Sequence, residues 1–123
     1  MLHEELTDNI IGAYYEVYNT LGYGFLEQVY QNAMFKELSH RGLHCDCQKH
    51  IDVFYKGELV GFYVPDIIVE NSVILELKAL RDITGDETAQ ILNYLKATDK
   101  DVGFLMNFGA KKPFFKRFDN FFE

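Results

Sequence analysis

The sequence contains no tryptophan, only two prolines and only two cysteines among its 123 residues. Its longest apolar runs are far shorter than the roughly 18 residues that a membrane span needs, and its first residues are acidic rather than signal-like. We therefore expect a cytoplasmic protein without a membrane segment. Cys45 and Cys47 stand two residues apart, a spacing that strains a disulfide, so we expect both thiols to be reduced.

Positive charge is also scarce, because 12 lysines and arginines face 19 acidic residues and give a net charge of −7. This balance argues against a protein that coats nucleic acid through a broad basic face. It is compatible with an enzyme that reaches phosphate through a metal ion, since a divalent cation neutralises clustered carboxylates. The basic residues gather near the C-terminus, and this run is either a solvated strand face or a phosphate contact. They are Lys111, Lys112, Lys116 and Arg117.

The length suits a single domain over residues 1–123. Apolar residues at helical spacing predict helices over 26–41, over 84–98, and from Thr7 or Asp8, either of which can cap free N–H groups, to Leu21. Ala89, Leu92 and Leu95 form the predicted apolar side of the helix over 84–98. Alternating or β-rich runs predict strands. They cover 51–55, 59–64, 66–69, 73–78 and 102–107, whereas 114–122 is ambiguous between strand and helix. The predicted order of elements is two helices, a meander of three or four strands, a helix and a strand. This order predicts an α/β fold in which helices flank a mixed central sheet.

The runs 66–69 and 73–78 form a predicted hairpin with its turn near Asn71. Asp66 then lies opposite Glu76 or its direct neighbour. Antiparallel partners stand about 4.5–5.5 Å apart at Cβ, and two carboxylates so close repel unless a cation lies between them. Oxygen ligands of this kind suit Mg²⁺ or Mn²⁺.

Lys78 follows Glu76 by two residues in the same predicted strand, so both side chains share a face. Leu75 and Leu77 then point the other way, into the core. A lysine beside metal ligands can hold an attacking water and stabilise negative charge on phosphate. On spacing alone, an exposed surface pair is equally compatible with this pattern.

Two helices supply further candidates. Glu27 lies in the first turn of the second helix, where a negative charge is favourable in any case. Gln90 and Tyr94 are four residues apart on the third helix and share a face, which is either an ordinary polar surface or part of a site.

Five segments together resemble the GxxExxY protein family, a branch of the PD-(D/E)XK nuclease superfamily, over about residues 7 to 120. The signature segment is Gly24-Phe25-Leu26-Glu27-Gln28-Val29-Tyr30. The others are Ile10-Ile11-Gly12-Ala13 with Glu16-Val17, Pro65-Asp66 with Glu76-Leu77-Lys78-Ala79, the helix from Ala89 to Lys96, and Leu105-Met106-Asn107-Phe108-Gly109. One departure is Glu87, which stands where the family often has a histidine.

The resemblance implies a restriction-endonuclease-like core and hydrolysis of phosphodiester bonds in DNA or RNA with Mg²⁺ or Mn²⁺. It implies that Asp66, Glu76 and the backbone carbonyl of Leu77 hold the metal with help from Glu27, and that Lys78 positions the water. It also implies that Gln90 and Tyr94 border the site and contact nucleic acid, to which we add Lys111 and Lys112.

Two other functional readings stay open at this level. The net acidity is equally compatible with an inactive nuclease-fold module that acts in protein interaction or regulation, and the chemistry also permits a small phosphate-containing substrate. A domain this small has little surface for a long duplex, so we expect a homodimer. The phenylalanines near the C-terminus are either core or a partner surface. They are Phe114, Phe115, Phe118, Phe121 and Phe122.

Overall fold

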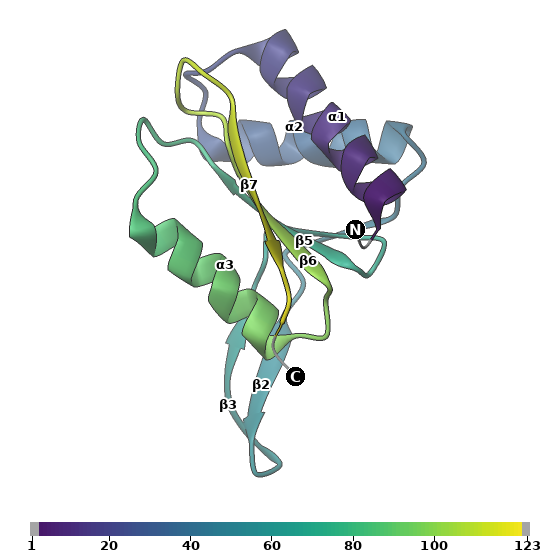
Figure 1. Ribbon diagram of the computed structural model, residues 1–123, viewed down its shortest axis with the longest axis vertical. Helices are drawn as coiled ribbons and strands as arrows, with labels where there is room; N and C mark the ends of the chain where they lie inside the picture. The colour runs from purple at the N-terminus through teal and green to yellow at the C-terminus, as the bar shows by residue number, and fades with distance from the viewer. Residues whose placement is uncertain (1–2, 122–123) are drawn as a thin grey trace.

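A mixed five-stranded sheet lies between two helices on one face and one helix on the other in the computed structural model (Figure 1), which describes residues 3–121. The helices are α1 (Glu4–Leu21), α2 (Glu27–His40) and α3 (Gly85–Ala97). The strands, in spatial order, are β1 (Cys45–Cys47), β4 (Ile67–Val69), β5 (Val73–Lys78), β6 (Val102–Asn107) and β7 (Phe114–Asp119). Only β5 and β6 pair in parallel, because α3 forms the crossover between them. The predicted α/β, restriction-endonuclease-like fold is confirmed.

The alternation along β5 decides which helix layer each of its side chains meets. Val73, Leu75 and Leu77 are buried in the core formed with α1 and α2, as the sequence predicts for the two leucines. Ile74 is buried on the other face, against Tyr94 and Leu95 of α3. Glu76 and Lys78 follow Ile74 at intervals of two, so they belong to the α3 face of the sheet.

Two helix predictions need correction. The first helix begins at Glu4 rather than at Thr7 or Asp8, and His3 precedes it in the left-handed region (φ 56°). Thr7 lies inside the helix, where its buried hydroxyl bonds the Glu4 carbonyl at 3.1 Å instead of capping free N–H groups. On α3 the predicted apolar side included Ala89, which is exposed. The second and third helices otherwise match their predicted ranges closely.

The predicted meander is wrong, because β2 (Ile51–Tyr55) and β3 (Glu58–Tyr63) form a two-stranded sheet of their own. Pro65 follows β3 and cannot donate to a sheet ladder, so pairing stops before β4 begins. This β2–β3 hairpin projects from the body of the molecule (Figure 1). Only its base packs, with the Tyr63 ring 5.1 Å from that of Tyr94.

The ambiguous C-terminal run forms the edge strand β7. Phe115 and Phe118 pack against the two faces of the sheet, whereas Phe114 and Phe121 are exposed, and Phe122 lies outside the described residues. The core reading is therefore confirmed for Phe115 and Phe118, whereas a partner surface stays a prediction for the exposed phenylalanines. Arg117 is paired with Asp119 at 2.9 Å.

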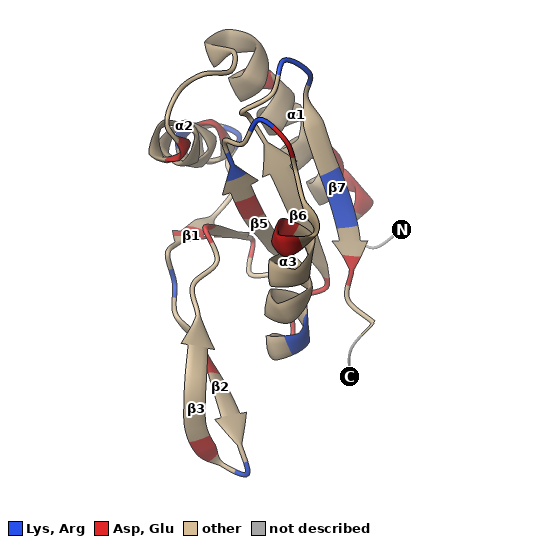
Figure 2. Cartoon of the chain, turned by 90° about the vertical axis from the view of Figure 1, so that its left-hand side faces the viewer, with Lys and Arg blue, Asp and Glu red and all other residues tan. Residues whose placement is uncertain are grey.

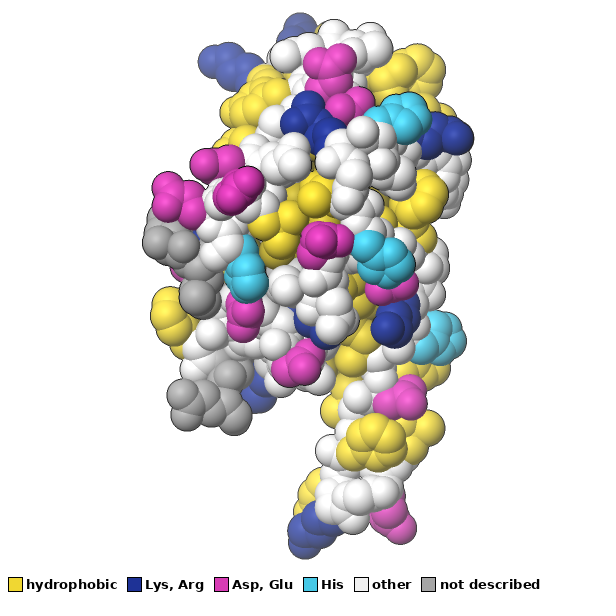
Figure 3. Space-filling view, turned by 90° about the vertical axis from the view of Figure 1, so that its right-hand side faces the viewer, with side chains coloured by type: hydrophobic (Ala, Val, Ile, Leu, Met, Phe, Trp, Pro, Cys, Tyr) yellow, Lys and Arg dark blue, Asp and Glu magenta, His cyan; other side chains and the backbone are white. Residues whose placement is uncertain are grey.

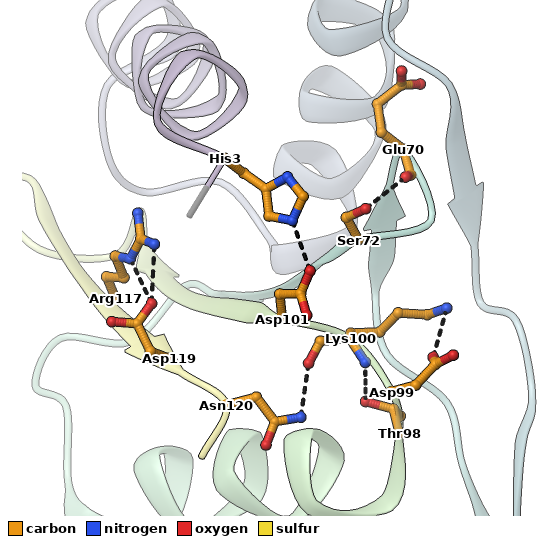
Figure 4. A network of polar contacts seen from close by, with 10 residues as sticks. All are labelled: His3, Glu70, Ser72, Thr98, Asp99, Lys100, Asp101, Arg117, Asp119 and Asn120. Carbon is orange, nitrogen blue, oxygen red and sulfur yellow. Dashed lines mark hydrogen bonds and ion pairs between the residues drawn. The ribbon is translucent and has the colours of Figure 1, made fainter. Parts of the chain in front are cut away.

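Polar contacts fasten both ends of the chain to the turn that leads into β6 (Figure 4). His3 Nε2 lies 2.7 Å from Asp101 Oδ2, which joins the start of α1 to this turn. The Asn120 side chain donates to the carbonyl of Lys100 at 2.7 Å and so joins the end of β7 to the same place. These contacts attach α1 and β7 to the start of β6, the strand that pairs with β5.

Cys45 and Cys47 are both free thiols, and burial raises the pKa of Cys45 to about 11. None of the helices formed by residues 3–121 has the length and apolar character that a bilayer span requires.

Candidate metal centre

Asp66 and Glu76 meet across the β4–β5 hairpin. Ile67 pairs with Leu75, and continuing this register by one residue sets Asp66 opposite Glu76. The Asp66 N–H donates to Glu76 Oε1 at 3.1 Å. In return, the Leu77 N–H donates to Asp66 Oδ2 at 2.8 Å. The juxtaposition predicted from the hairpin is therefore present, with each carboxylate held by the strand that carries the other.

Burial makes ionisation of these two carboxyl groups unfavourable. Glu76 is only 2% exposed, and burial, with the charge of Asp66 second, raises its pKa from 4.5 to about 8. Burial also raises the pKa of Asp66, although the N–H of Leu77 partly offsets this effect. Two such groups can both be ionised near neutral pH only if positive charge lies close to them.

Lys78 supplies part of that positive charge. It ends β5, half-buried, and its ammonium lowers the pKa of both Asp66 and Glu76. Figure 2 shows an acidic and a basic position close together near the carboxyl end of this strand. One lysine does not neutralise two carboxylates, so the centre keeps a net negative charge that suits a cation.

Glu27 stands further back. It is the first residue of α2, and its charge raises the pKa of Asp66 and Glu76. Within residues 3–121, however, no three histidine, cysteine, aspartate or glutamate side chains gather closely enough to hold a metal ion. Glu27 instead accepts a hydrogen bond from Gln31 Nε2 at 3.2 Å.

The residues present fit a hard divalent cation. Mg²⁺ usually takes only one or two carboxylates and completes its shell with water and substrate phosphate. Asp66 and Glu76 each use one oxygen in the backbone bonds described above, which leaves the second oxygen of each carboxylate for a metal. Neither sulfur nor imidazole belongs to this pair, so its donor set favours Mg²⁺ or Mn²⁺ over zinc.

Gln90 and Tyr94 share a face of α3, as their spacing predicts, and Tyr94 lies close enough to Glu76 and Asp66 to feel their charges. Gln90 Nε2 donates to the Tyr94 hydroxyl at 3.1 Å. Burial raises the pKa of Tyr94 to about 12, and the charges of Glu76 and Asp66 act in the same direction. Glu87, which departs from the family pattern, accepts from the N–H of Thr84 at 2.8 Å and completes a capping box at the start of α3.

Lys111 and Lys112 are exposed in the loop between β6 and β7. Lys111 lines an open groove of about 510 Å³ next to Arg81, which follows Lys78 by three residues. Arg81 was not predicted as a site residue. The remaining lining residues are Tyr23, Asp82, Gly109 and Ala110.

The end of β6 braces the chain just after Lys78. The buried Asn107 donates to the carbonyl of Leu80 at 2.8 Å and accepts from the N–H of Leu80 at 2.9 Å. A side chain at Gly109 would collide with the backbone of Ala79 and Leu80. Both residues belong to a segment that carries the family resemblance, but the sequence did not show that this segment holds the loop beyond Lys78.

Gln48 was also missed. It lies between β1 and β2 in the left-handed region (φ 56°), its backbone N–H donates to the Asp66 carbonyl at 3.2 Å, and its side chain lies close enough to the Asp66 carboxylate to lower the pKa of that group. Its Nε2 also approaches Gln31 Oε1 at 3.4 Å, so amide groups join Asp66 to Glu27 through Gln48 and Gln31. No periodicity or motif marks Gln48, because it lies outside every regular element.

Comparison with curated proteins finds no match. The family described as the PD-(D/E)XK nuclease superfamily matches residues 4–118, which include every residue of the metal centre described above. The matched range runs from the start of α1 into β7 and covers nearly the whole sequence. The chain therefore belongs to the PD-(D/E)XK nuclease superfamily.

Proposed function

We propose that this protein is a metal-dependent nuclease that hydrolyses phosphodiester bonds in DNA or RNA. One observation carries the proposal: the half-buried Asp66 and the buried Glu76 meet across the hairpin next to Lys78. Asp66, Glu76 and the carbonyl of Leu77 hold Mg²⁺ or Mn²⁺. Because Glu27 does not join the pair in a three-residue cluster, it would add negative charge near the metal rather than bind it directly.

The residues around the proposed metal site have separate roles in hydrolysis and in substrate binding. The bound cation polarises the phosphate and lowers the pKa of a coordinated water. Lys78 orients the attacking water and stabilises charge that develops on the phosphate oxygens. Gln90 and Tyr94 contact the nucleic acid beside the site, and Lys111 and Lys112 contact its phosphate backbone. Loss of one phosphate contact weakens the binding of all nucleic-acid sequences to a similar extent.

Cleavage assays test this function. Single-stranded and duplex DNA and RNA are incubated with the protein in Mn²⁺ or Mg²⁺, and the parent is compared with Lys78→Ala. We expect cleavage that needs the metal and falls at least about 100-fold in the variant, the usual size of such a contribution. Lys36→Ala, an exposed lysine on α2, is the matched control and should cleave normally. Equal cleavage by the parent and Lys78→Ala would defeat the proposal.

We further propose that the chain belongs to the GxxExxY branch of its superfamily, because each residue of that signature has a distinct role. Gly24 adopts a φ of 113°, which a side chain would disfavour, in the link between α1 and α2. Glu27 begins α2 near the metal centre. Tyr30 holds the link, since its hydroxyl donates to the Gly22 carbonyl at 2.6 Å and accepts from the Phe25 N–H at 3.2 Å.

We also propose that two copies of the chain pair through the β2–β3 hairpin. Exposed apolar side chains are spread along this projection among polar and charged ones (Figure 3), and a lone two-stranded hairpin is marginal in water. Lys56 and Glu58 stand on either side of its tip, so a two-fold arrangement can match the lysine of one copy with the glutamate of the other. The exposed apolar residues are Phe54, Tyr55, Leu59, Val60 and Phe62.

Light scattering tests this pairing. We expect the parent protein to form a dimer. The dissociation constant of this dimer should rise strongly in the double variant Phe54→Ser, Phe62→Ser, because both residues are more than half exposed in the single chain. Phe114→Ser removes an exposed phenylalanine from β7 and is the matched control. A strict monomer at high protein concentration would rule the pairing out.

A further inference from the structure

A small cavity of about 220 Å³ lies between α2 and the edge of the sheet, and Asp66 forms part of its wall. Four residues from one face of α2 line it, together with the ends of β1 and β4. These residues are Gln28, Gln31, Asn32 and Phe35 from the helix, and Cys47, Gln48, Asp66 and Ile67 from the strands and their ends. The cavity therefore opens directly beside the metal centre.

The size of the cavity limits what it can hold. At about 30 Å³ for each water in the liquid, it has room for about seven water molecules. It is smaller than the roughly 300–1,000 Å³ of pockets for drug-sized ligands. One planar heterocycle fits such a space, whereas a hydrogen-bonded pair of bases does not.

The lining disfavours anionic ligands and purely apolar ligands. It contains no lysine or arginine, and Asp66 would repel an anion, so a phosphate group is disfavoured. Four carboxamides disfavour an apolar ligand, because their donors and acceptors need partners. A neutral ring with mixed donors and acceptors along its edge satisfies both conditions.

The carboxamides are held next to one another and offer both donors and acceptors. Gln28 Nε2 donates to Asn32 Oδ1 at 3.0 Å, and Gln48 Nε2 approaches Gln31 Oε1 at 3.4 Å. Glutamine and asparagine side chains of this kind pair with the edges of nucleobases. The left-handed backbone of Gln48 keeps its amide at the junction of the cavity and Asp66, and such conformations cluster at functional sites.

Phe35 adds a surface on which a base can stack. It lies two helical turns after Gln28 on the same face of α2, and 40% of it is exposed although it is fully apolar. Unpaired bases are commonly bound by stacking on an aromatic ring while amides contact their edges. The cavity supplies both kinds of contact within one helix face.

We propose that this cavity binds one unpaired nucleobase, and that the substrate is therefore single-stranded nucleic acid or a strand end. The inference rests on the proposed nuclease function, because it places the base next to the phosphate that the metal centre would cleave. A paired base cannot enter, so intact duplex is bound less well.

Fluorescence anisotropy tests the proposal with Lys78→Ala protein in Mn²⁺, so that the probes are not cleaved. The probes are ten-nucleotide single strands of DNA and RNA, the matching duplexes, and strands of the same length without bases. We expect the single strands to bind at least tenfold more tightly than the duplexes and the baseless strands. Phe35→Ala should weaken single-strand binding by about 5- to 100-fold, the usual effect of losing one stacked base, and leave the baseless strand unchanged.

Two further variants sharpen the test. Phe35→Trp keeps an aromatic ring and should restore binding, whereas Tyr15→Ala, an aromatic on α1 that is 39% exposed, should have no effect. The proposal is overturned if baseless strands bind as tightly as natural ones, or if Phe35→Ala binds single strands like the Lys78→Ala parent.

The two proposals fail in distinguishable ways. If the native protein cleaves nucleic acid and Lys78→Ala does not, but Phe35→Ala binds normally, the nuclease function stands and the base site is wrong. If no substrate is cleaved, yet single-strand binding depends on Phe35, the base site stands and the nuclease function is wrong.

Discussion

The amide of Asp66 donates to the carboxylate of Glu76, and the residue after Glu76 returns a hydrogen bond to the carboxylate of Asp66. This reciprocal arrangement fixes both side chains through main-chain groups, which move less than side chains. Both carboxylates are therefore preorganised before any cation binds. The unfavourable free energy of placing them side by side is offset by the rest of the folding free energy.

The metal-free protein should lose stability as the pH rises from about 4.5 to 8. The pKa of Glu76 is raised in the folded chain, so the folded state binds more protons than the unfolded state in this window. The stabilisation is complete below pH 4.5 and is lost as the pH passes about 8. At about 1.4 kcal/mol for each pKa unit, the total change is a few kcal/mol. Urea unfolding at a series of pH values measures it.

Glu76→Gln is the control for this pH dependence, because the amide keeps an oxygen for the Asp66 N–H and does not titrate. We expect a much flatter stability profile for this variant. A parent whose stability rises steadily over the same range would contradict the raised pKa of Glu76.

Metal titration should separate direct ligands from Glu27. We expect Asp66→Asn to abolish measurable Mn²⁺ binding in calorimetry, since it removes one of two carboxylates. Glu27→Gln should weaken binding by only about tenfold, the lower end of the effect of an outer-shell partner. Equal losses in the two variants would mean that Glu27 binds the ion directly.

Gly109→Ala should destabilise the fold by about 3 kcal/mol or more, because the new methyl group meets the backbone of Ala79 and Leu80, which cannot rotate away. Gly85→Ala, at the start of α3, has open space around it and is the matched control. Thermal unfolding of both variants checks the prediction, and similar melting temperatures would refute it.

Asn107→Ala should cost roughly 3 kcal/mol, because it leaves the N–H and the carbonyl of Leu80 without their partners. If this brace positions Lys78, cleavage measured well below the melting temperature should also fall, with Mn²⁺ affinity unchanged. Asn93→Ala changes an exposed asparagine on α3 and should alter neither the stability of the fold nor the rate of cleavage.

The sequence was most informative where local pattern and burial agree. The hairpin that carries Asp66 and Glu76 is short, and its alternation directly determines which residues face each other. The Gln90 and Tyr94 pair was equally predictable, because two residues four positions apart on a helix share a face.

Other features depend on distant contacts and were not predictable. The separation of β2 and β3 from the main sheet depends on how the chain continues after Pro65, and alternation alone does not report which strands pair. The cavity beside Asp66 joins one face of α2 to the ends of two strands, β1 and β4, that come later in the chain. Gln48 acquires its role only when these parts come together.

The turn between β4 and β5 has a consequence for how this centre tolerates change. Glu70 and Asn71 both adopt left-handed conformations there, and the turn length fixes which residues of the two strands face each other. Inserting or deleting one residue would shift one strand against the other and reverse its faces. Glu76 would then enter the apolar layer beneath α1 and α2, and a leucine would stand in its place. The spacing of this turn is therefore as much a part of the chemistry as the carboxylates themselves.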